Sequence, residues 1–223
     1  MRDLGLAESK PMGRSILYLV RHGESVANFK GIMASRKIDP PLTNTGIEQA
    51  NQLANLLAPL RLRVIYSSPW LRARQTAKIL SLRYGAQVIF HSGLAEIDLG
   101  ILDGKKKACQ EKWMQHEEVK KKWEQGVLGV GFPEGETLSD VRRRLECLFD
   151  ALATKQERRI LIVGHCLLFI AIIWLFCENH GPTFDDGHMN PGHISILAKT
   201  ARKLRLLRFN IPPNGSPKQI LIG

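Results

Sequence analysis

Two histidines directly follow short apolar runs that are typical of buried strands. His22 comes after the run SILYLV at 15–20, and His165 comes after RILIVG at 159–164. In a parallel sheet, functional residues lie in loops at the carboxyl ends of the strands, so we expect both imidazoles at one edge of the sheet. A neutral imidazole is a competent covalent nucleophile, and a cationic one can hold an anion.

Two arginines and a glutamate stand at comparable positions. Arg21 precedes His22, Arg72 lies in the first turn of an expected helix, and Glu96 follows an expected strand after a short loop. Arginine presents a planar fork that matches phosphate oxygens, and a carboxylic acid can protonate a leaving oxygen. A lone histidine or arginine is more often structural or solvated. The combination predicts phosphoryl transfer without a metal ion, because fixed cations replace the metal.

Short apolar runs alternate with segments of helical spacing along most of the chain. We expect strands at 15–20, 64–66, 87–90, 159–163, 193–198 and 204–209. We expect helices at 45–57, 68–85, 105–125, 137–153 and after residue 165. Continuous apolar strands that alternate with helices indicate an α/β fold with a mainly parallel sheet covered on both faces.

Local signals indicate where two of these helices begin. Thr45 with Glu48 can form a capping box, and Ile47 shares a helix face with the alanines that follow it. Ser68 is expected to cap the next helix, with Pro69 in its first turn.

The composition suits one globular domain. The chain has 223 residues, of which 44% are hydrophobic and 24% are charged, and one core of that size is ordinary for an α/β domain. The formal net charge of +11 favours anionic partners, which include nucleic acid, a membrane surface and phosphorylated small molecules. Charge alone does not choose among them.

Neither the cysteines nor the apolar segments indicate secretion or a membrane span. The four cysteines form no C-x-x-C pair, and we interpret them as reduced thiols. Residues 1–14 show no apolar signal sequence. Gly164 and His165 interrupt the run at 160–177, and the apolar part after them is shorter than the ~20 residues that a span needs. We therefore expect a cytoplasmic protein with no membrane partner.

One cluster late in the chain raises the question of a metal site. Its potential ligands are Asp185, Asp186, His188 and His193. Their spacing matches no standard ligand pattern, and the glycines and proline among them mark a loop. We therefore expect no metal ion and no other cofactor.

Six sequence blocks, taken in order, resemble the histidine phosphatase superfamily, which includes the cofactor-dependent phosphoglycerate mutases. The blocks are LYLVRHGES (17–25), PLTNTGIEQA (41–50), YSSPWLRARQTA (66–77), LAEIDLGILDG (94–104), FPEGETLSDVRRRL (132–145) and ILIVGH (160–165). The resemblance covers roughly residues 15–209. RHGE alone is a moderately specific signal, whereas six blocks in the same order identify the family.

The resemblance implies a phosphoglycerate mutase-like fold, a three-layer α/β/α sandwich with a mainly parallel central sheet. It also implies that His22 is the nucleophile that becomes phosphorylated and that Glu96 is the proton donor. At Cys166 the family commonly has glycine, and only the backbone N–H would be needed there to bind phosphate. The other implied phosphate-binding residues are Arg21, Asn28, Arg72 and His165.

The residues after Glu96 bear on the choice between a phosphatase and a mutase. The mutases follow their catalytic acid with an aromatic-basic stretch and carry a later pair of arginines for the substrate carboxylate. Here Glu96 is followed by IDLG at 97–100, as in the phosphatase branch. The lysine runs at 105–107 and 120–122 can serve a carboxylate, but such runs are more often solvated helix faces. We therefore favour a phosphatase.

The sequence thus predicts a metal-independent phosphomonoesterase that acts on a small phosphorylated metabolite through a phosphohistidine. A phosphoglycerate mutase and a basic nucleic-acid-binding protein stay as alternatives, although no nucleic-acid-binding motif is visible and no nucleic-acid partner is expected. We expect an N-terminal arm at 1–14, a catalytic domain at 15–209 and a C-terminal tail at 210–223. Substrate specificity is expected to depend on 29–39 and 104–135, and a homodimer is left open.

Overall fold

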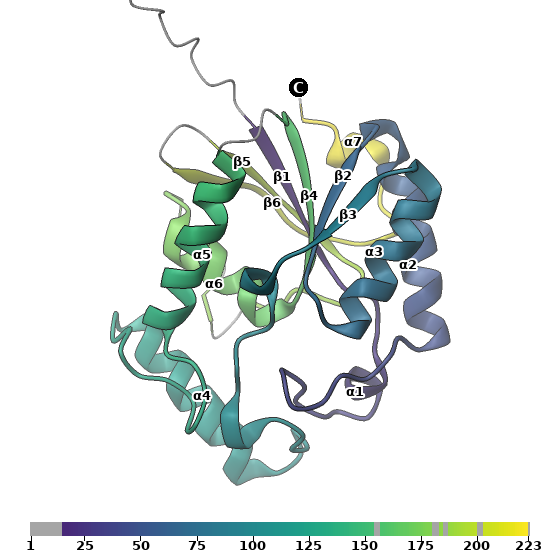
Figure 1. The fold of residues 1–223 in the computed structure, drawn as a ribbon. Coiled ribbons are helices and arrows are strands. Elements are labelled where there is room, and N and C mark those ends of the chain that lie inside the picture. The colour runs from purple at the N-terminus through teal and green to yellow at the C-terminus, as the bar shows by residue number, and fades with distance from the viewer. Residues whose placement is uncertain (1–14, 154–156, 180–182, 185–186, 200–202, 223) are drawn as a thin grey trace, which may run out of the picture.

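A six-stranded sheet forms the centre of the molecule (Figure 1). The computed structural model describes residues 15–153, 157–179, 183–184, 187–199 and 203–222. The strands are β1 (Ser15–Arg21), β2 (Val64–Ser67), β3 (Gln87–Phe90), β4 (Arg159–Gly164), β5 (Ile194–Lys199) and β6 (Leu204–Ile211). Their order across the sheet is β3-β2-β4-β1-β5-β6.

The first four strands run parallel to one another. β1 pairs in parallel with β4, and β2 pairs in parallel with both β3 and β4. β5 runs antiparallel to β1, and β6 runs antiparallel to β5. The carboxyl ends of β1 to β4 therefore lie at the same end of the sheet, as the alternation of strands and helices predicts.

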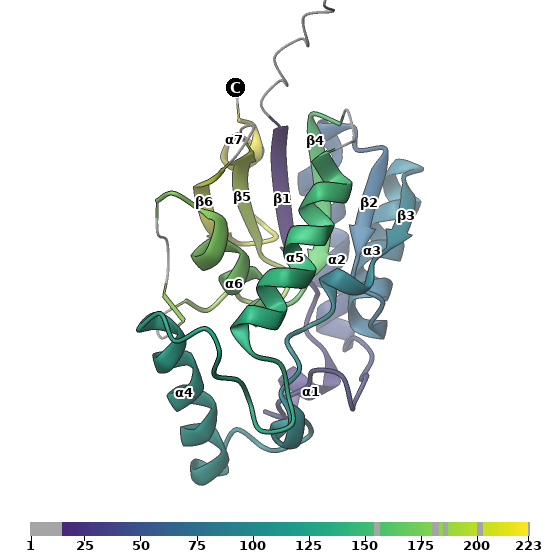
Figure 2. The same cartoon turned by 60° about the vertical axis from the view of Figure 1, so that its left-hand side comes forward.

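Helices cover both faces of this sheet (Figures 1 and 2). One face is covered by α5 (Leu138–Ala153) and α6 (Cys166–Phe176). The opposite face is covered by α2 (Asn44–Leu57) and α3 (Leu71–Tyr84). The predicted three-layer α/β/α fold is confirmed.

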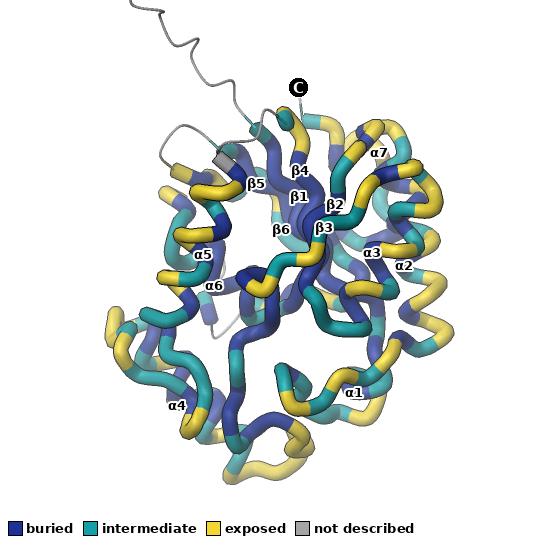
Figure 3. Tube along the Cα trace, in the orientation of Figure 1, coloured by how far each residue is buried: buried dark blue, intermediate teal, exposed yellow. Residues whose placement is uncertain are grey.

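The strand β1 illustrates why the sheet is buried on both faces. Leu17 and Leu19 belong to the core beneath α5 and α6, whereas Tyr18 and Val20 belong to the core beneath α2 and α3. All four are almost completely shielded from solvent, and β1 is among the darkest segments of Figure 3. Successive side chains of a strand point to opposite faces, so a strand between two helical layers needs a continuous apolar run.

Two helices lie beyond the carboxyl ends of the parallel strands, away from the sandwich. They are α1 (Val26–Phe29), which follows β1, and α4 (Gln110–Glu124), which precedes α5 (Figures 1 and 2). Single-turn 3-10 helices lie at Ala58–Leu60, Ser92–Leu94 and Gly100–Leu102.

The helix expected from residue 105 begins only at Gln110, because the backbone before it pairs with another loop. Lys105 C=O accepts from Met33 N–H over 2.8 Å, and Lys107 N–H donates to Gly31 C=O over 2.8 Å. These two bonds join the loop after α1 to the segment before α4.

Two predicted helix caps are wrong. α2 is capped by Thr43, whose hydroxyl accepts from Gly46 N–H over 3.1 Å, so the expected box of Thr45 with Glu48 does not cap it. Ile47 lies in the first turn of α2 and is 41% exposed rather than packed.

The second cap differs by two residues. α3 is capped by Trp70 instead of Ser68. Ser68 accepts from Trp70 N–H over 3.3 Å and turns its hydroxyl toward His165.

The described residues after β5 pack on the domain as far as α7. β6 continues to Ile211, and the short helix α7 (Pro217–Ile220) places the buried side chain of Ile220 in the core beneath α2 and α3. Tyr18 Oη donates to Ile220 C=O over 3.2 Å. The boundary predicted at residue 209 stays a prediction, and the arm expected at 1–14 lies outside the described residues.

The apolar segment at 160–177 divides into β4 and α6, which His165 separates as the sequence predicts. No helix in the part of the chain that the structure describes is long and apolar enough to cross a membrane.

Candidate active site

His22 follows the last residue of β1 and is held at the end of the sheet. Its backbone N–H donates to the carbonyl of Gly164, the last residue of β4, over 3.0 Å. Its side chain is almost fully buried, and Nδ1 lies 2.7 Å from Gly23 C=O. A carbonyl only accepts hydrogen bonds, so Nδ1 carries the ring proton and Nε2 keeps its lone pair.

The imidazole of His22 is neutral. Burial lowers the pKa of His22 well below its usual value, and the positive charges of Arg72 and Arg21 lower it further. The hydrogen bond to the Gly23 carbonyl acts in the opposite direction and does not outweigh these effects. A neutral ring with a lone pair on Nε2 is the form that can attack an electrophile.

Gly23 lets α2 approach the loop that carries His22. A Cβ atom at Gly23 would lie 2.3 Å from the carbonyl oxygen of Gly46, in the first turn of α2. Gly23 N–H also donates to Thr76 Oγ1 over 3.1 Å, which ties the loop to α3. Glycine is therefore required here by the close approach of α2 to this loop.

Arg72 lies in the first turn of α3, as predicted, and only 1% of it is exposed. Its Nε donates to His22 Nε2 over 3.2 Å. Its Nη2 donates to Ala34 C=O over 3.2 Å and to Ser35 C=O over 3.4 Å. Burial lowers the pKa of Arg72, while the carboxylates of Glu96 and Asp39 act in the opposite direction. An arginine stays charged even so, which makes Arg72 a buried cation in contact with His22.

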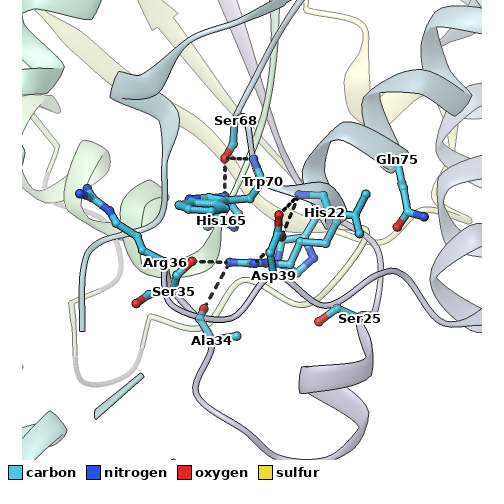
Figure 4. Close-up of polar contacts among 12 residues, drawn as sticks. His22, Ser25, Ala34, Ser35, Arg36, Asp39, Ser68, Trp70, Gln75 and His165 are labelled. Atoms are coloured by element: carbon cyan, nitrogen blue, oxygen red, sulfur yellow. Dashed lines mark hydrogen bonds and ion pairs between the residues drawn. The ribbon is translucent and has the colours of Figure 1, made fainter. Parts of the chain in front are cut away.

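Asp39 contacts both Arg72 and the first residue of α3 (Figure 4). Its carboxylate accepts from Leu71 N–H over 2.8 and 2.9 Å, at the helix terminus where a negative charge is favoured. The same carboxylate lies 3.6 Å from Arg72 Nη1. Asp39 therefore balances the buried charge and fixes the start of the helix that carries it.

Asp103 fixes the loop whose carbonyls accept from Arg72. Its buried carboxylate accepts from Ser35 N–H over 3.0 Å, from Ser35 Oγ over 2.7 Å and from Arg36 N–H over 2.6 Å. It also accepts from Lys37 N–H. Ser35 Oγ in turn accepts from Leu99 N–H over 3.1 Å. One carboxylate thus organises three successive residues of the loop.

His165 follows β4, is fully buried, and lies edge-on to His22 with 5.2 Å between the ring centroids. Its Nε2 lies 2.7 Å from Ser68 Oγ (Figure 4). Because Ser68 Oγ already accepts from Trp70 N–H, it can donate its own proton to Nε2. Nδ1 then carries the ring proton of His165.

Burial lowers the pKa of His165 well below its usual value, and the charges of Arg72 and Arg21 lower it further. These effects favour the neutral form of His165. The sequence suggests a cationic second histidine that could hold an anion. His165 is not among the residues that line the pocket described below.

Arg21, the last residue of β1, is also buried and faces the loop before β5. Its Nη1 donates to Met189 C=O and lies 3.3 Å from His188 Nε2. Burial lowers the pKa of His188 to about 4, and the charge of Arg21 contributes to that shift. His188 is thus a neutral acceptor for Arg21 at neutral pH.

Glu96 lies against the N-terminus of α6. Its Oε1 accepts from Ile97 N–H and from Leu168 N–H, each over 2.9 Å, and its Oε2 accepts from Leu167 N–H over 3.3 Å. The side chain is mostly buried and lines the pocket. Oε2 is the less engaged oxygen and is the one available for proton transfer.

Asn28 and Cys166 complete the set of predicted residues. Asn28 Oδ1 accepts from the backbone and the hydroxyl of Ser25 in a capping box, which leaves its amide N–H groups for a ligand. Cys166 is the first residue of α6, and its thiol lies 3.8 Å from His188 Nδ1. Both residues line the pocket.

Three buried nitrogens of these residues have no hydrogen-bond partner in the described part of the chain. They are Arg21 Nε, Arg72 Nη1 and His165 Nδ1. An unpaired buried donor costs about 1–3 kcal/mol, so a set of three in one place needs a reason. A tetrahedral oxyanion presents enough acceptors to pair with several such donors.

A pocket that is open to solvent adjoins these residues. It is lined on one side by Arg21, His22, Arg72 and Glu96. The two segments expected to set specificity contribute to the other side: Ile32 and Met33 come from 29–39, and Lys107, Trp113, His116 and Lys120 come from 104–135.

The potential metal ligands noted in the sequence are only partly described. Asp185 and Asp186 lie outside the described residues. His188 contacts Arg21, and His193 Nδ1 lies 3.1 Å from Pro191 C=O. Within the described ranges, no three histidine, cysteine or acidic side chains are grouped so as to hold a metal ion.

Comparison with known proteins decides the family. The sequence model described as the histidine phosphatase superfamily, branch 1, matches residues 17–212. The chain belongs to the histidine phosphatase superfamily, and it is an enzyme of that superfamily. The assignment made from the six sequence blocks is therefore confirmed.

Relatives within the superfamily carry names of two kinds. A protein of Hydrogenobacter thermophilus that carries the name phosphoserine phosphatase 2 is 29% identical over 197 residues, which cover 87% of this chain and 94% of that protein. A protein of Yersinia pestis named phosphoglycerate mutase GpmB is 32% identical over 162 residues, which cover 68% of this chain and 72% of that protein.

Solved structures show the same fold. A mycobacterial glucosyl-3-phosphoglycerate phosphatase in complex with VO3 has a TM-score of 0.77 at 24% identity, covering 88% of this chain and 98% of its own. A phosphoglycerate mutase of Bacillus anthracis has a TM-score of 0.76 at 18% identity, covering 90% of this chain and 94% of its own.

Four polar residues that support the site were given no role in it from the sequence: Ser35, Asp39, Asp103 and Ser68, which was expected only as a helix cap. Each bonds to a partner between 32 and 97 positions away. Asp103 and Ser68 fall within blocks that resemble the family, which is the signal that was available for them. No local pattern marks Ser35 or Asp39.

The role of Asp103 can be tested by replacing its carboxylate. Asp103→Asn should lower the free energy of unfolding by about 2–3 kcal/mol, because an amide cannot accept from all the donors that converge on it. Urea unfolding measures this. Asp150→Asn, at an exposed position of α5, is the matched control and should change stability little. Equal stability of the two variants would contradict the role of Asp103.

The protonation state of the histidines can be measured by nitrogen NMR of the imidazoles. At pH 5.5, a full unit below the ordinary histidine pKa of about 6.5, His22 and His165 should both remain neutral, because burial and the arginines lower their pKa values. His22 should show the tautomer with the proton on Nδ1. His22→Gln identifies its signals, and a charged His22 at this pH would show that the site is less buried than the structure indicates.

Proposed function

We propose that the chain is a metal-independent phosphomonoesterase that works through a phosphohistidine at His22. The contact between His22 and Arg72 is the observation that supports it most. A neutral imidazole keeps its Nε2 lone pair, and a buried guanidinium donates to that atom over 3.2 Å. A nucleophile and a fixed cation in direct contact are what phosphoryl transfer needs when no metal ion supplies the charge.

In the first step, His22 Nε2 attacks the phosphorus atom of a phosphomonoester. A P–N bond forms, the P–O bond to the alcohol breaks, and the leaving oxygen takes a proton from the carboxylic acid of Glu96. The attack requires Nε2 to give up its hydrogen bond to Arg72 Nε. That N–H is then available for an oxygen of the phosphoryl group.

In the second step, water attacks the phosphorus of the phosphohistidine. The Glu96 carboxylate takes a proton from the water, the P–N bond breaks, and His22 returns to its neutral form as inorganic phosphate is released. Arg21 and Arg72 stay close to the phosphoryl oxygens throughout, and His165 contributes a further N–H. Splitting the transfer into two displacements replaces one difficult step by two easier ones.

The substrate class is a small organic phosphate, and hydrolysis is favoured over transfer to a second substrate hydroxyl. Glu96 is followed by the apolar and acidic stretch at 97–100. The relative from Hydrogenobacter thermophilus, whose match covers 87% of this chain, bears the name of a phosphatase, and so does the mycobacterial structure.

A phosphoglycerate mutase is the second candidate, since the relative from Yersinia pestis bears that name at 32% identity. Release of free phosphate from most turnovers supports the phosphatase. Interconversion of phosphoglycerate isomers with little free phosphate would support the mutase.

The central test is to trap the phosphoenzyme during turnover in the presence of chelator. The label should be labile in acid, stable in alkali, and located on the peptide that contains His22. His22→Ala should abolish both label and turnover. His91→Asn is the matched control, because His91 lies outside the pocket and asparagine can still accept from Gly93 N–H. A label on Ser25 or Ser68, or activity that chelation removes and added magnesium restores, would refute this mechanism.

The role of Glu96 is tested by comparing leaving groups. Glu96→Gln should slow hydrolysis of alkyl phosphates by roughly 10²–10⁴-fold, the usual contribution of a general acid. Aryl phosphates should lose much less in the first step, because a phenolate leaves without full protonation. The readout is the rate of phosphoenzyme formation for each ester in a rapid-quench experiment. Equal losses for both esters would remove Glu96 from the role of acid.

A further inference from the structure

The pocket beside His22 has an outer wall built by α4 and the loop that precedes it. Trp113, His116 and Lys120 follow one another at spacings of three and four residues, so they share one face of α4. All three line the pocket, together with Lys107 from the preceding loop. A phosphate held at His22 would direct its alcohol portion toward this wall.

One of the two lysines in the wall is already paired. Lys120 is mostly buried, and its Nζ donates to both carboxylate oxygens of Glu117 over 3.0 and 2.8 Å. Although burial acts to raise the pKa of Glu117, hydrogen bonds from His116 and Lys120 outweigh it and lower that pKa to about 2. The charge of Lys120 is therefore balanced by its own helix.

Lys107 is different. No ion pair to Lys107 occurs within the described part of the chain, and its contact in the wall is with the ring of Trp113, whose centroid lies 5.6 Å from Nζ. Trp113 is itself fixed, because it stacks on His116 with 4.9 Å between centroids, and His116 stacks on Phe132. The backbone of Lys107 is held by its bond to Gly31. Lys107 is thus an exposed cation at the pocket that forms no ion pair with any described residue.

Two positive side chains of the pocket, Arg21 and Lys120, act on the Lys107 ammonium. Burial lowers the pKa of Lys107, and the charges of Arg21 and Lys120 lower it further, while the Cys166 thiol and Glu117 oppose them. Arg21 is one of the proposed phosphate-binding residues, and its charge acts on Lys107. Lys107 therefore lies close to the proposed phosphate site. An ammonium in such a field gains from an anion that binds next to it.

We infer that Lys107 is a specificity residue that binds a second anionic group, a carboxylate or a further phosphate, on the alcohol part of the substrate. The inference rests on the proposed phosphatase function and narrows its substrate class. The preferred substrates are phosphomonoesters that carry a second anion within reach of Lys107 and Trp113. A lysine in a run of three is then not simply part of a solvated surface.

Three esters that share a three-carbon chain test this directly: the phosphate of 3-hydroxypropionate, propane-1,3-diol bisphosphate and n-propyl phosphate. They differ in ending with a carboxylate, a phosphate or a methyl group. Hydrolysis of p-nitrophenyl phosphate is measured beside them as a test of the phosphatase function alone. The variants are Lys107→Met, Lys107→Arg and the control Lys106→Met, whose lysine is exposed like Lys107 but lies outside the pocket lining.

For the wild-type enzyme, kcat/KM should be about tenfold to a hundredfold higher for at least one of the doubly anionic esters than for propyl phosphate, on the scale of a charge-assisted hydrogen bond. Lys107→Met should bring that ratio close to unity, Lys107→Arg should retain most of it, and Lys106→Met should leave it unchanged. Whichever doubly anionic ester has the higher kcat/KM shows whether Lys107 binds a carboxylate or a second phosphate.

Two outcomes overturn the inference and leave the phosphatase function standing. The first is hydrolysis of p-nitrophenyl phosphate with no preference for a second anion. The second is a preference that survives Lys107→Met. If the wild-type enzyme hydrolyses none of the four esters, the proposed function fails and the inference fails with it.

Discussion

The contact between a buried guanidinium and a neutral imidazole is the interaction on which the rest of this site depends. Arg72 is 1% exposed and touches His22. An unpaired buried charge costs several kcal/mol, so the fold has to surround Arg72 with acceptors. The carbonyls of Ala34 and Ser35 and the carboxylate of Asp39 do this, and all three belong to a single loop. The position of that loop is therefore as much a requirement of the site as the position of the arginine.

The need to place acceptors around Arg72 also explains why the loop at 34–39, which has no regular secondary structure, is held by many hydrogen bonds. Asp103 draws together the backbone of residues 35–37, and the segment after it pairs with the segment 31–33. The sheet provides the other half of the arrangement. β2, β4 and β1 are adjacent in the sheet, and they deliver Ser68, His165 and His22 at their carboxyl ends. Adjacent parallel strands bring His165 within 2.7 Å of Ser68 and edge-on to His22 across large gaps in the sequence.

Residues next to buried strands could be predicted from the sequence, whereas residues whose roles depend on distant contacts could not. His22, His165 and Arg21 stand next to buried apolar strands, and the rule for carboxyl ends brings them together without any knowledge of contacts. The fold was predictable for the same reason. Ser35 and Asp39 lie in a stretch with no periodicity, and their roles depend on partners 68 and 32 positions away. Only the folded chain brings such pairs together.

The start of α4 is a similar case. Residues 105–109 are polar and compatible with a helix, but bonds to a loop some 70 positions earlier take the backbone groups that a helix would use. That pairing is also what presents Lys107 to the pocket. Tertiary contacts overrode local propensity at a position that bears on function, and the departure from the predicted helix is informative for that reason.

The charges of the site link substrate binding to proton affinity. Burial lowers the pKa of His165, and the charges of Arg72 and Arg21 add to the effect. A phosphate dianion bound among these arginines offsets their field and raises the affinity of His165 for a proton. Burial is the largest of the causes and is not removed by the phosphate, so the rise is partial. The cationic form that the sequence suggests for His165 therefore depends on the bound anion, and the same arginines that attract phosphate keep both imidazoles neutral until it arrives.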